Sequence, residues 1–312
     1  MIRDGKRYNL DFDPNGNPLL IDPATGEVTQ GFYYPIFDGD QVITQAQQKA
    51  RREYVESLKR AAGRRTAAKE LGPHFFILGN QRFDDLRPQT AARLVYLETY
   101  GAYSDDSGNR LKLSSKTNMK RDDLKKVLRL GRDAVNDFWN EVNPRYLIED
   151  ENGLILNSEF FIKGQLPSGR SETYYRAYIR GVRKLYEGTP KSRHKHLGYF
   201  FELLPYINVE FNTLCFNPLE ADADKIEHMT VDEFCEMIGY NANRRDRLLG
   251  IYKELKFEVT VNGEPRMERF VSITGDGLTK GDSKIYINPH VLYSGSDYKQ
   301  VAILGSFHKD KA

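Results

Sequence analysis

Apolar positions recur at helical spacing in two separate segments of this 312-residue chain, and both segments follow the same order. A short helical stretch leads into a turn that contains glycine, a second helix follows, and two apolar runs joined by a tight turn come last. The first copy covers residues 124–156 and turns at Gly131, whereas the second covers residues 234–263 and turns at Gly239. The second turn is two residues longer, so the start of its following helix is less firmly predicted.

A further helix with a strong apolar face precedes each copy. The first begins at Pro88, because a proline suits the first turn of a helix. The second ends before Pro205, and its core face is spaced i, i+3, i+4, i+7: Leu197, Phe200, Phe201 and Leu204. With a short strand between the first and second helices, the order becomes helix, strand, helix, turn, helix, hairpin. That order is typical of a winged helix, which normally places its recognition helix in a DNA groove.

The sequence therefore predicts an α+β protein, mainly α, with two winged-helix domains, a basic connecting helix and an extended N-terminal arm. Turn signals such as Asp22-Pro23-Ala24-Thr25-Gly26 fill the arm and leave it little core. A tyrosine-rich amphipathic helix is expected from Ser171 to Glu187. The predicted divisions are an arm with a basic helix at 1–72, domain 1 at 73–168, the connecting helix at 169–191 and domain 2 at 192–312.

The formal net charge of +2 hides an uneven distribution of charge along the chain. Residues 45–69 hold eight basic residues against two acidic ones, and residues 163–196 hold nine against two. Residues 220–236 hold seven acidic residues against Lys225 alone. Basic segments of this density attract phosphate, while the acidic stretch is interpreted as a solvated face or, alternatively, as a docking surface.

The first expected recognition helix carries Arg132, Asn136 and Asn140 on one face, away from its apolar positions. Arginine matches guanine and asparagine matches adenine in the major groove, so this face is a candidate for reading bases. Asp133 and Asp137 on the same helix oppose that interpretation, because carboxylates are repelled by phosphates. An ordinary solvated face is the alternative.

The remaining candidate DNA contacts come from the second copy and from the predicted connecting helix. Bases are usually contacted by the N-terminal end of a recognition helix, and that end is basic in the second copy. The connecting helix offers a stripe of cations suited to phosphates rather than to bases. These candidates are Asn243, Arg244, Arg245, Arg247, Arg176, Arg180, Arg183, Lys184, Lys191, Arg193 and Lys195.

The sequence patterns that could indicate catalysis or a cofactor do not match the motifs required for either. His194-Lys195-His196 lies in a basic loop or helix start rather than around a strand residue, so no metal site is predicted. The glycines near Lys280 do not follow the order of a nucleotide-binding loop, and a hairpin tip is expected there. Cys215 and Cys235 are expected to be reduced and buried. We expect no catalytic residue, no cofactor and no metal.

No run of about 18 apolar residues exists, and the first residues lack the apolar core of a secretory signal. These features predict a cytoplasmic protein that does not partner a membrane.

The paired units, the basic segment between them and the sequence HKHLGYFFELLPYIN resemble the tandem winged-helix replication initiators of plasmids and phages of low-GC Gram-positive bacteria. The resemblance covers roughly residues 75 to 295. It implies binding of repeated or palindromic origin sites, a change of oligomeric state such as homodimer formation, and recruitment of host replication proteins. The alternative is a phage or mobile-element transcriptional regulator of the same architecture, and a third possibility is a pair of protein-interaction modules.

Overall fold

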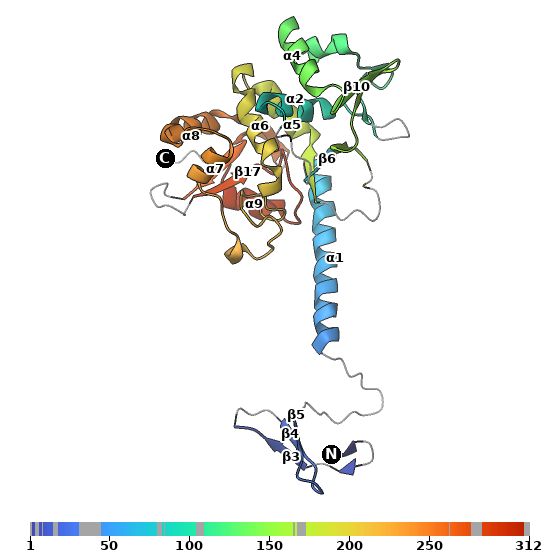
Figure 1. The fold of residues 1–312 in the computed structure, drawn as a ribbon, viewed down its shortest axis with the longest axis vertical. Helices are drawn as coiled ribbons and strands as arrows, with labels where there is room; N and C mark the ends of the chain where they lie inside the picture. Colours follow the sequence, from blue (N-terminus) through green and yellow to red (C-terminus); the bar gives the residue numbers. More distant parts are fainter. Residues whose placement is uncertain are drawn as a thin grey trace. The chain divides into compact units, whose positions relative to one another are not determined.

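The computed structural model describes residues 2–3, 6–7, 9–14, 18–30, 45–79, 83, 85–103, 109–164, 166, 173–261, 263–275 and 283–308. The described chain is a mixed α+β protein with small antiparallel sheets (Figure 1). It divides into two compact units, residues 1–57 and 58–312, and the division falls inside helix α1, Gln45–Leu71. No helix in the described part combines the length and hydropathy needed to cross a membrane.

The first unit contains antiparallel strands where the sequence predicted an extended arm. A hairpin pairs the first two, and a three-stranded sheet in the order β3-β4-β5 follows. The strands are β1 (Ile2–Arg3), β2 (Lys6–Arg7), β3 (Asn9–Phe12), β4 (Pro18–Ile21) and β5 (Val28–Gln30). The turn predicted at Asp22–Gly26 is confirmed, since the Asp22 carboxylate accepts from the Ala24 amide at 2.8 Å and Gly26 has φ +69°. The extended arm was wrong because these turns fold the segment back on itself.

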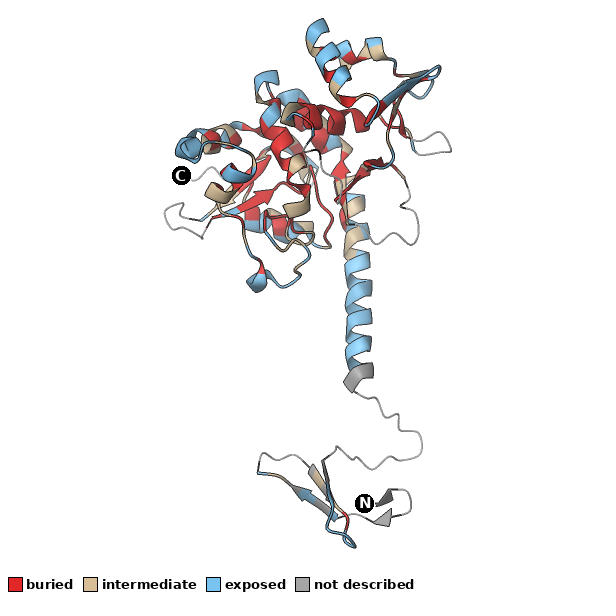
Figure 2. Cartoon of the chain, viewed as in Figure 1, coloured by how far each residue is buried: buried red, intermediate tan, exposed pale blue. Residues whose placement is uncertain are grey.

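Helix α1 confirms the helix that the sequence predicted over the basic segment. Residues 48–62 are exposed, which Figure 2 shows as a pale blue length of helix. Further along, Ala67 and Leu71 are buried in a small cluster with Tyr178, Tyr293 and other residues of the second unit. Burial therefore fixes only the last turns of the helix.

The N-terminal half of the second unit holds the first helix-turn-helix copy. Its elements are β6 (His74–Leu78), α2 (Pro88–Glu98), β7 (Asn109–Arg110), β8 (Lys112–Ser114), β9 (Thr117–Asn118), α3 (Leu124–Val127), α4 (Arg132–Val142), β10 (Leu147–Asp150), β11 (Gly153–Leu156) and β12 (Phe161–Ile162). Strand β11 lies between β10 and β7 in an antiparallel sheet. The predicted start at Pro88 and the predicted hairpin after α4 are confirmed.

The C-terminal half repeats helix, helix and hairpin. Its elements are β13 (Tyr174–Tyr178), α5 (Ile179–Gly188), α6 (His194–Glu202), α7 (Val231–Met237), α8 (Arg245–Glu254), β14 (Lys256–Val261), β15 (Glu264–Arg269), β16 (Val271–Thr274), β17 (Lys284–Ile287) and α9 (Tyr298–Gly305). A 3-10 turn, Ala242–Arg244, precedes α8 and takes up the longer turn. The expected hairpin tip around Lys280 lies outside the described residues. Both cysteines are buried, as expected.

The helix predicted from Ser171 to Glu187 is wrong in its first half. Residues 174–178 form strand β13, which pairs antiparallel with β6, and only α5 is helical. Tyr175 and Ala177 are buried while Tyr174 and Arg176 are half-buried, so the segment follows a period of two once a partner strand is present. The connecting segment is therefore a strand followed by a ten-residue helix.

The turn in each copy closes α3 or α7 with the same pair of backbone hydrogen bonds. The longer-range bond of the pair joins Leu130 N–H to Lys125 O at 3.1 Å in the first copy. In the second copy it joins Tyr240 N–H to Cys235 O at 2.7 Å. This bond pattern requires a left-handed residue just past the helix. That residue is Gly239, φ +61°, in the second copy but Arg129, φ +56°, in the first. The predicted glycine of the first turn, Gly131, instead precedes α4 with φ −72°.

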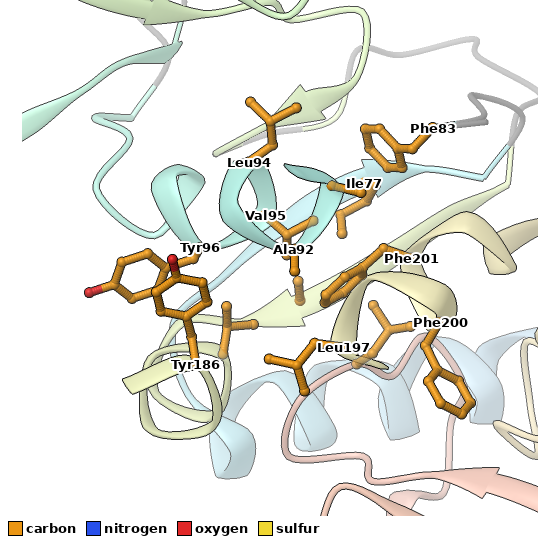
Figure 3. Packing of buried hydrophobic residues seen from close by; sticks show 14 of the residues in the cluster. Ile77, Phe83, Ala92, Leu94, Val95, Tyr96, Tyr186, Leu197, Phe200 and Phe201 are labelled. Atoms are coloured by element: carbon orange, nitrogen blue, oxygen red, sulfur yellow. The ribbon is translucent and has the colours of Figure 1, made fainter. Parts of the chain in front are cut away.

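One buried apolar cluster runs from Phe75 to Leu292 through both halves. Helix α2 packs along α6, and Figure 3 shows Ala92 and Val95 of α2 near Leu197 and Phe201 of α6. The approach requires Gly198, because a Cβ there would lie 1.7 Å from the Pro88 carbonyl oxygen. The domain boundaries predicted at residues 168 and 191 stay a prediction. The hydrophobic core extends across both of them.

Candidate nucleic-acid interface

Helix α4 turns its apolar face to the core and its polar face to solvent. Val135, Phe138 and Val142 are buried, whereas Arg132 and Asn136 are exposed. The burial pattern follows from the amphipathic spacing, which leaves the predicted base-reading face outward. The N-terminal half of α4 can therefore be reached by a ligand.

Arg121, which the sequence interpretation did not single out, joins this face. Its guanidinium lies 4.8 Å from the centre of the Trp139 ring, and its Nη2 lies 3.5 Å from Asn136 Oδ1. The indole orients the cation, since arginine stacks favourably on aromatic rings. The aromatic residue at 139 and the basic residues before α3 were the available sequence signal for this pairing.

The C-terminal end of α4 is acidic. Asn140 is exposed beside a shallow groove lined by Asp85, Asp137 and Glu141 among others. The Arg87 Nε is bound to Glu141 at 2.8 Å, and the Arg145 Nη1 is bound to Asp85 at 2.5 Å, so the neighbouring cations are occupied by these carboxylates. A phosphate is disfavoured at this end of the helix.

Helix α8 begins with a concentration of exposed polar and basic side chains. Asn243, Arg244 and Arg247 are exposed. Neither guanidinium forms a hydrogen bond or ion pair within the described part of the chain, although the Arg244 backbone N–H donates to the Asn241 carbonyl at 2.9 Å. Arg245 differs, because its Nη1 binds Asp232 at 2.8 Å, and the pKa of its guanidinium is raised by that hydrogen bond. Three of the four residues predicted here are therefore available to a partner.

Helix α6 carries a further exposed cation, Lys195, beside the buried His196. Burial lowers the pKa of His196 to about 4, although its bond to the Arg193 carbonyl raises it, and the charges of Lys195, Arg193 and Arg247 lower it further. The Tyr252 hydroxyl of α8 donates to the His196 carbonyl at 3.2 Å, which ties the two helices together. The charges of Lys195 on α6 and Arg247 on α8 therefore both lower the pKa of His196.

We call Lys195, Asn243, Arg244 and Arg247 the α6–α8 basic face. The sequence assigned Lys195 to the connecting stripe, whereas in the fold it lies on α6, which α8 contacts through Tyr252. Arg193 lies beside this face, but its Nη1 binds Glu254 at 2.5 Å.

The cations of the predicted connecting stripe have partners within the protein. Arg180 binds the Thr260 hydroxyl at 2.7 Å, and Lys184 binds Glu258 at 3.1 Å, so both join α5 to β14. Arg183 binds the Thr99 hydroxyl at 2.9 Å and stacks 4.2 Å from the Tyr100 ring centre. These contacts hold elements of the fold together.

Arg176 does not belong to a helical stripe, because it lies on strand β13. It is half-buried, and its Nη1 donates to the Ser294 carbonyl at 3.2 Å. Burial lowers the pKa of its guanidinium, the reverse of what a partner phosphate would do. Lys191, by contrast, is exposed and lines a crevice with Arg129.

Comparisons with known protein families, with curated proteins and with solved structures find no match to this chain. The interface is therefore described by its own geometry alone.

Proposed function

We propose that this protein is a sequence-specific double-stranded DNA-binding protein of the replication-initiator type, built on two winged helices. The observation that carries the proposal is the α6–α8 basic face, where Arg244 and Arg247 are exposed at the start of α8, a helix that follows a helix and a turn, and Lys195 is exposed on α6. Recognition helices contact bases with their N-terminal residues, and long cations neutralise the flanking phosphates.

In this proposal α8 supplies most of the base contacts. Arg244 and Arg247 are the arginines for guanine, and Asn243 is the side chain for adenine. Lys195 reaches a phosphate from α6, which fixes the register of α8 without adding sequence information. Arg245, held by Asp232, supports the face rather than reading a base.

Helix α4 has a smaller role in the same proposal. Arg132 and Asn136 at its exposed N-terminal half contact DNA, while the acidic groove next to Asn140 stays outside the duplex. The two winged helices then contribute unequally, and α8 determines most of the specificity. Homodimer formation on paired sites and recruitment of host replication proteins belong to the same proposal.

Selection of bound duplexes from a random pool tests this function most directly. We expect an enriched motif, and we expect its affinity to fall steeply with salt, because each neutralised phosphate contributes about −0.9 to the slope of log K against log salt concentration. A pool without enrichment, together with binding that does not weaken in salt, would favour the protein-interaction alternative.

Footprinting on the enriched motif separates the initiator from a transcriptional regulator with the same elements. Protection of repeats that support plasmid maintenance favours the initiator. Protection confined to a promoter, with no effect on maintenance, favours the regulator.

A further inference from the structure

A crevice lies between the turn of the first helix-turn-helix and the segment that leaves α5. Its walls include Leu128, Arg129, Tyr186, Thr189, Lys191 and His194, and its volume is about 340 Å³. Sites for small molecules start at about 300 Å³, so this crevice has room for a compact ligand.

The side chains around the crevice give it a positive character. Arg129 and Lys191 are exposed along it, and the one carboxylate in the lining belongs to Glu187. Glu187 is already occupied, since its Oε1 accepts from the Tyr96 hydroxyl at 2.9 Å. Among the residues that the structure describes, the Arg129 guanidinium donates to the Glu187 carbonyl through Nη1, at 3.3 Å, and its other N–H groups remain for a ligand.

Arg129 stands at a position where glycine is the usual residue. Its φ of +56° is left-handed, and the matching position of the second copy is Gly239. A non-glycine residue in this conformation is strained, and such strain concentrates at functional sites. The first copy therefore has a strained backbone at Arg129, and the guanidinium of this residue lies beside the crevice.

Two buried groups next to Tyr186 each have one ring or guanidinium nitrogen without a partner. Arg93 on α2 is 9% exposed and its Nε has no hydrogen-bond partner, although its guanidinium also hydrogen-bonds to the Tyr186 hydroxyl. His194 is 2% exposed, and its Nδ1 also has no partner, although its Nε2 lies 3.0 Å from the Thr189 carbonyl. Burial is unfavourable for a cation, so a negative ligand near Arg93 would stabilise it.

Tyr186 connects these groups to the crevice. Its ring stacks on Tyr96 with centres 3.9 Å apart, as Figure 3 shows, and on His194 with centres 4.2 Å apart. Burial raises the pKa of Tyr186, while the charge of Arg93 acts against that rise. Because both faces of the ring are covered, Tyr186 is not available to stack on a nucleobase.

We propose that this crevice binds a small molecule bearing a phosphate group, with Arg129 and Lys191 holding the phosphate oxygens. Arginine offers a fork of donors that matches phosphate, and lysine adds a point charge. Leu128 and Pro190 line the crevice with apolar surface for the rest of the molecule. The site does not depend on the proposed DNA-binding function, since none of its residues belongs to the α6–α8 basic face.

The ligand would also alter His194. Burial lowers the pKa of this histidine to about 4, its backbone bonds raise it, and the charges of Arg93 and Lys191 lower it further. An anion in the crevice screens those two cations, so ligand binding should raise the pKa of His194. Histidine NMR signals followed against pH therefore report on occupation of this crevice.

Calorimetric titration of the full chain with inorganic phosphate and with pyrophosphate tests the proposal. We expect saturable binding of one pyrophosphate per chain, a weakening of about tenfold or more for Arg129→Gly and for Lys191→Ala, and a higher pKa of His194 in the complex. Glycine suits the left-handed backbone at 129, so that variant should keep its fold. Lys116→Ala, on the exposed turn between β8 and β9 and outside the lining of the crevice, is the matched control.

Absence of saturable binding would overturn the proposal, as would an equal loss of binding in the Lys116→Ala control. A third arm adds duplex DNA in excess. If duplex displaces pyrophosphate in equal numbers, the crevice holds a backbone phosphate, and the small-molecule site is wrong. If pyrophosphate binds although no duplex does, only the proposed DNA function fails.

Discussion

The two helix-turn-helix copies close their first helix in the same way but differ in the side chains they present. Both close the first helix with the same hydrogen-bond pair and a left-handed residue, yet that residue is Arg129 in one and Gly239 in the other. The second helix of the first copy, α4, holds one basic and three acidic side chains, whereas its counterpart α8 holds three basic and two acidic ones. The comparison teaches that repetition of a turn does not imply repetition of its surface chemistry.

The largest expected effect is on DNA affinity, and it should be greater for changes in the second copy than for changes in the first. Arg244→Ala with Arg247→Ala should weaken specific binding by about 1–3 kcal/mol for each lost base contact. Arg132→Ala with Asn136→Ala should cost less, because carboxylates surround α4. Competition binding against the selected motif and a scrambled duplex measures both pairs. If specific and nonspecific affinities fall equally in the first pair, these arginines contact only phosphate.

A second prediction concerns the core that both copies share. Gly198→Ala should lower the free energy of unfolding by about 3 kcal/mol, because the added Cβ would push α6 away from Pro88. Chemical denaturation measures the change. Gly250→Ala is the matched control, since Gly250 is also helical but nothing lies within 4 Å of a Cβ there, and it should be neutral or slightly stabilising. Equal losses in both variants would contradict the shared contact.

The third prediction uses two histidines of α6, of which His194 lies beside the first turn and His196 beside α8. Their pKa values in the folded protein are lowered from 6.5 to about 4, so below pH 6.5 the unfolded chain binds more protons. The stability they contribute is present above pH 6.5 and is lost as the pH falls toward 4, by up to about 1.4 kcal/mol per pH unit for each histidine.

Denaturation at pH 7 and at pH 5 should show this loss, and His194→Asn or His196→Asn should make it smaller. Part of the loss of stability should remain in both variants, because burial also lowers the pKa of His228 to about 4. His308→Asn, at an exposed position, is the control. An unchanged pH dependence in the two α6 variants would show that these histidines do not carry the effect.

The smallest effect is expected when the left-handed residues of the two turns are exchanged. Arg129→Gly should raise the free energy of unfolding by about 1 kcal/mol, because glycine adopts a positive φ without strain. Gly239→Arg should lower it by a similar amount. Thermal unfolding of both variants measures the pair. A destabilised Arg129→Gly would show that its contact with Glu187 outweighs the backbone strain.

Local patterns in the sequence were sufficient for most helices. The i, i+3, i+4, i+7 spacing of α6 placed Leu197, Phe200 and Leu204 in the core, where each is buried. Thr230 and Glu233, three residues apart, form a capping box at the start of α7, with Glu233 N–H donating to the Thr230 hydroxyl at 3.2 Å. These features depend on residues within one or two turns of each other.

The errors arose where a distant partner decides the conformation. Residues 174–178 show helical spacing of tyrosines, but β6 lies alongside and turns them into a strand. The same fold gives Arg180, Arg183 and Lys184 partners on other elements, which a helical wheel cannot show. It also separates Arg245, held by Asp232, from the exposed Arg244 next to it.

By itself the sequence determined the helices, the two matching turns and the segments that concentrate positive charge, because these depend on periodicity and on neighbouring residues. Only the tertiary structure decided which cations remain exposed, set Lys195 and Arg247 around the same histidine, His196, and buried Arg93 on α2. The physical reason is that burial and ion pairing are set by contacts between residues far apart in the chain, and those contacts exist only after the core has formed.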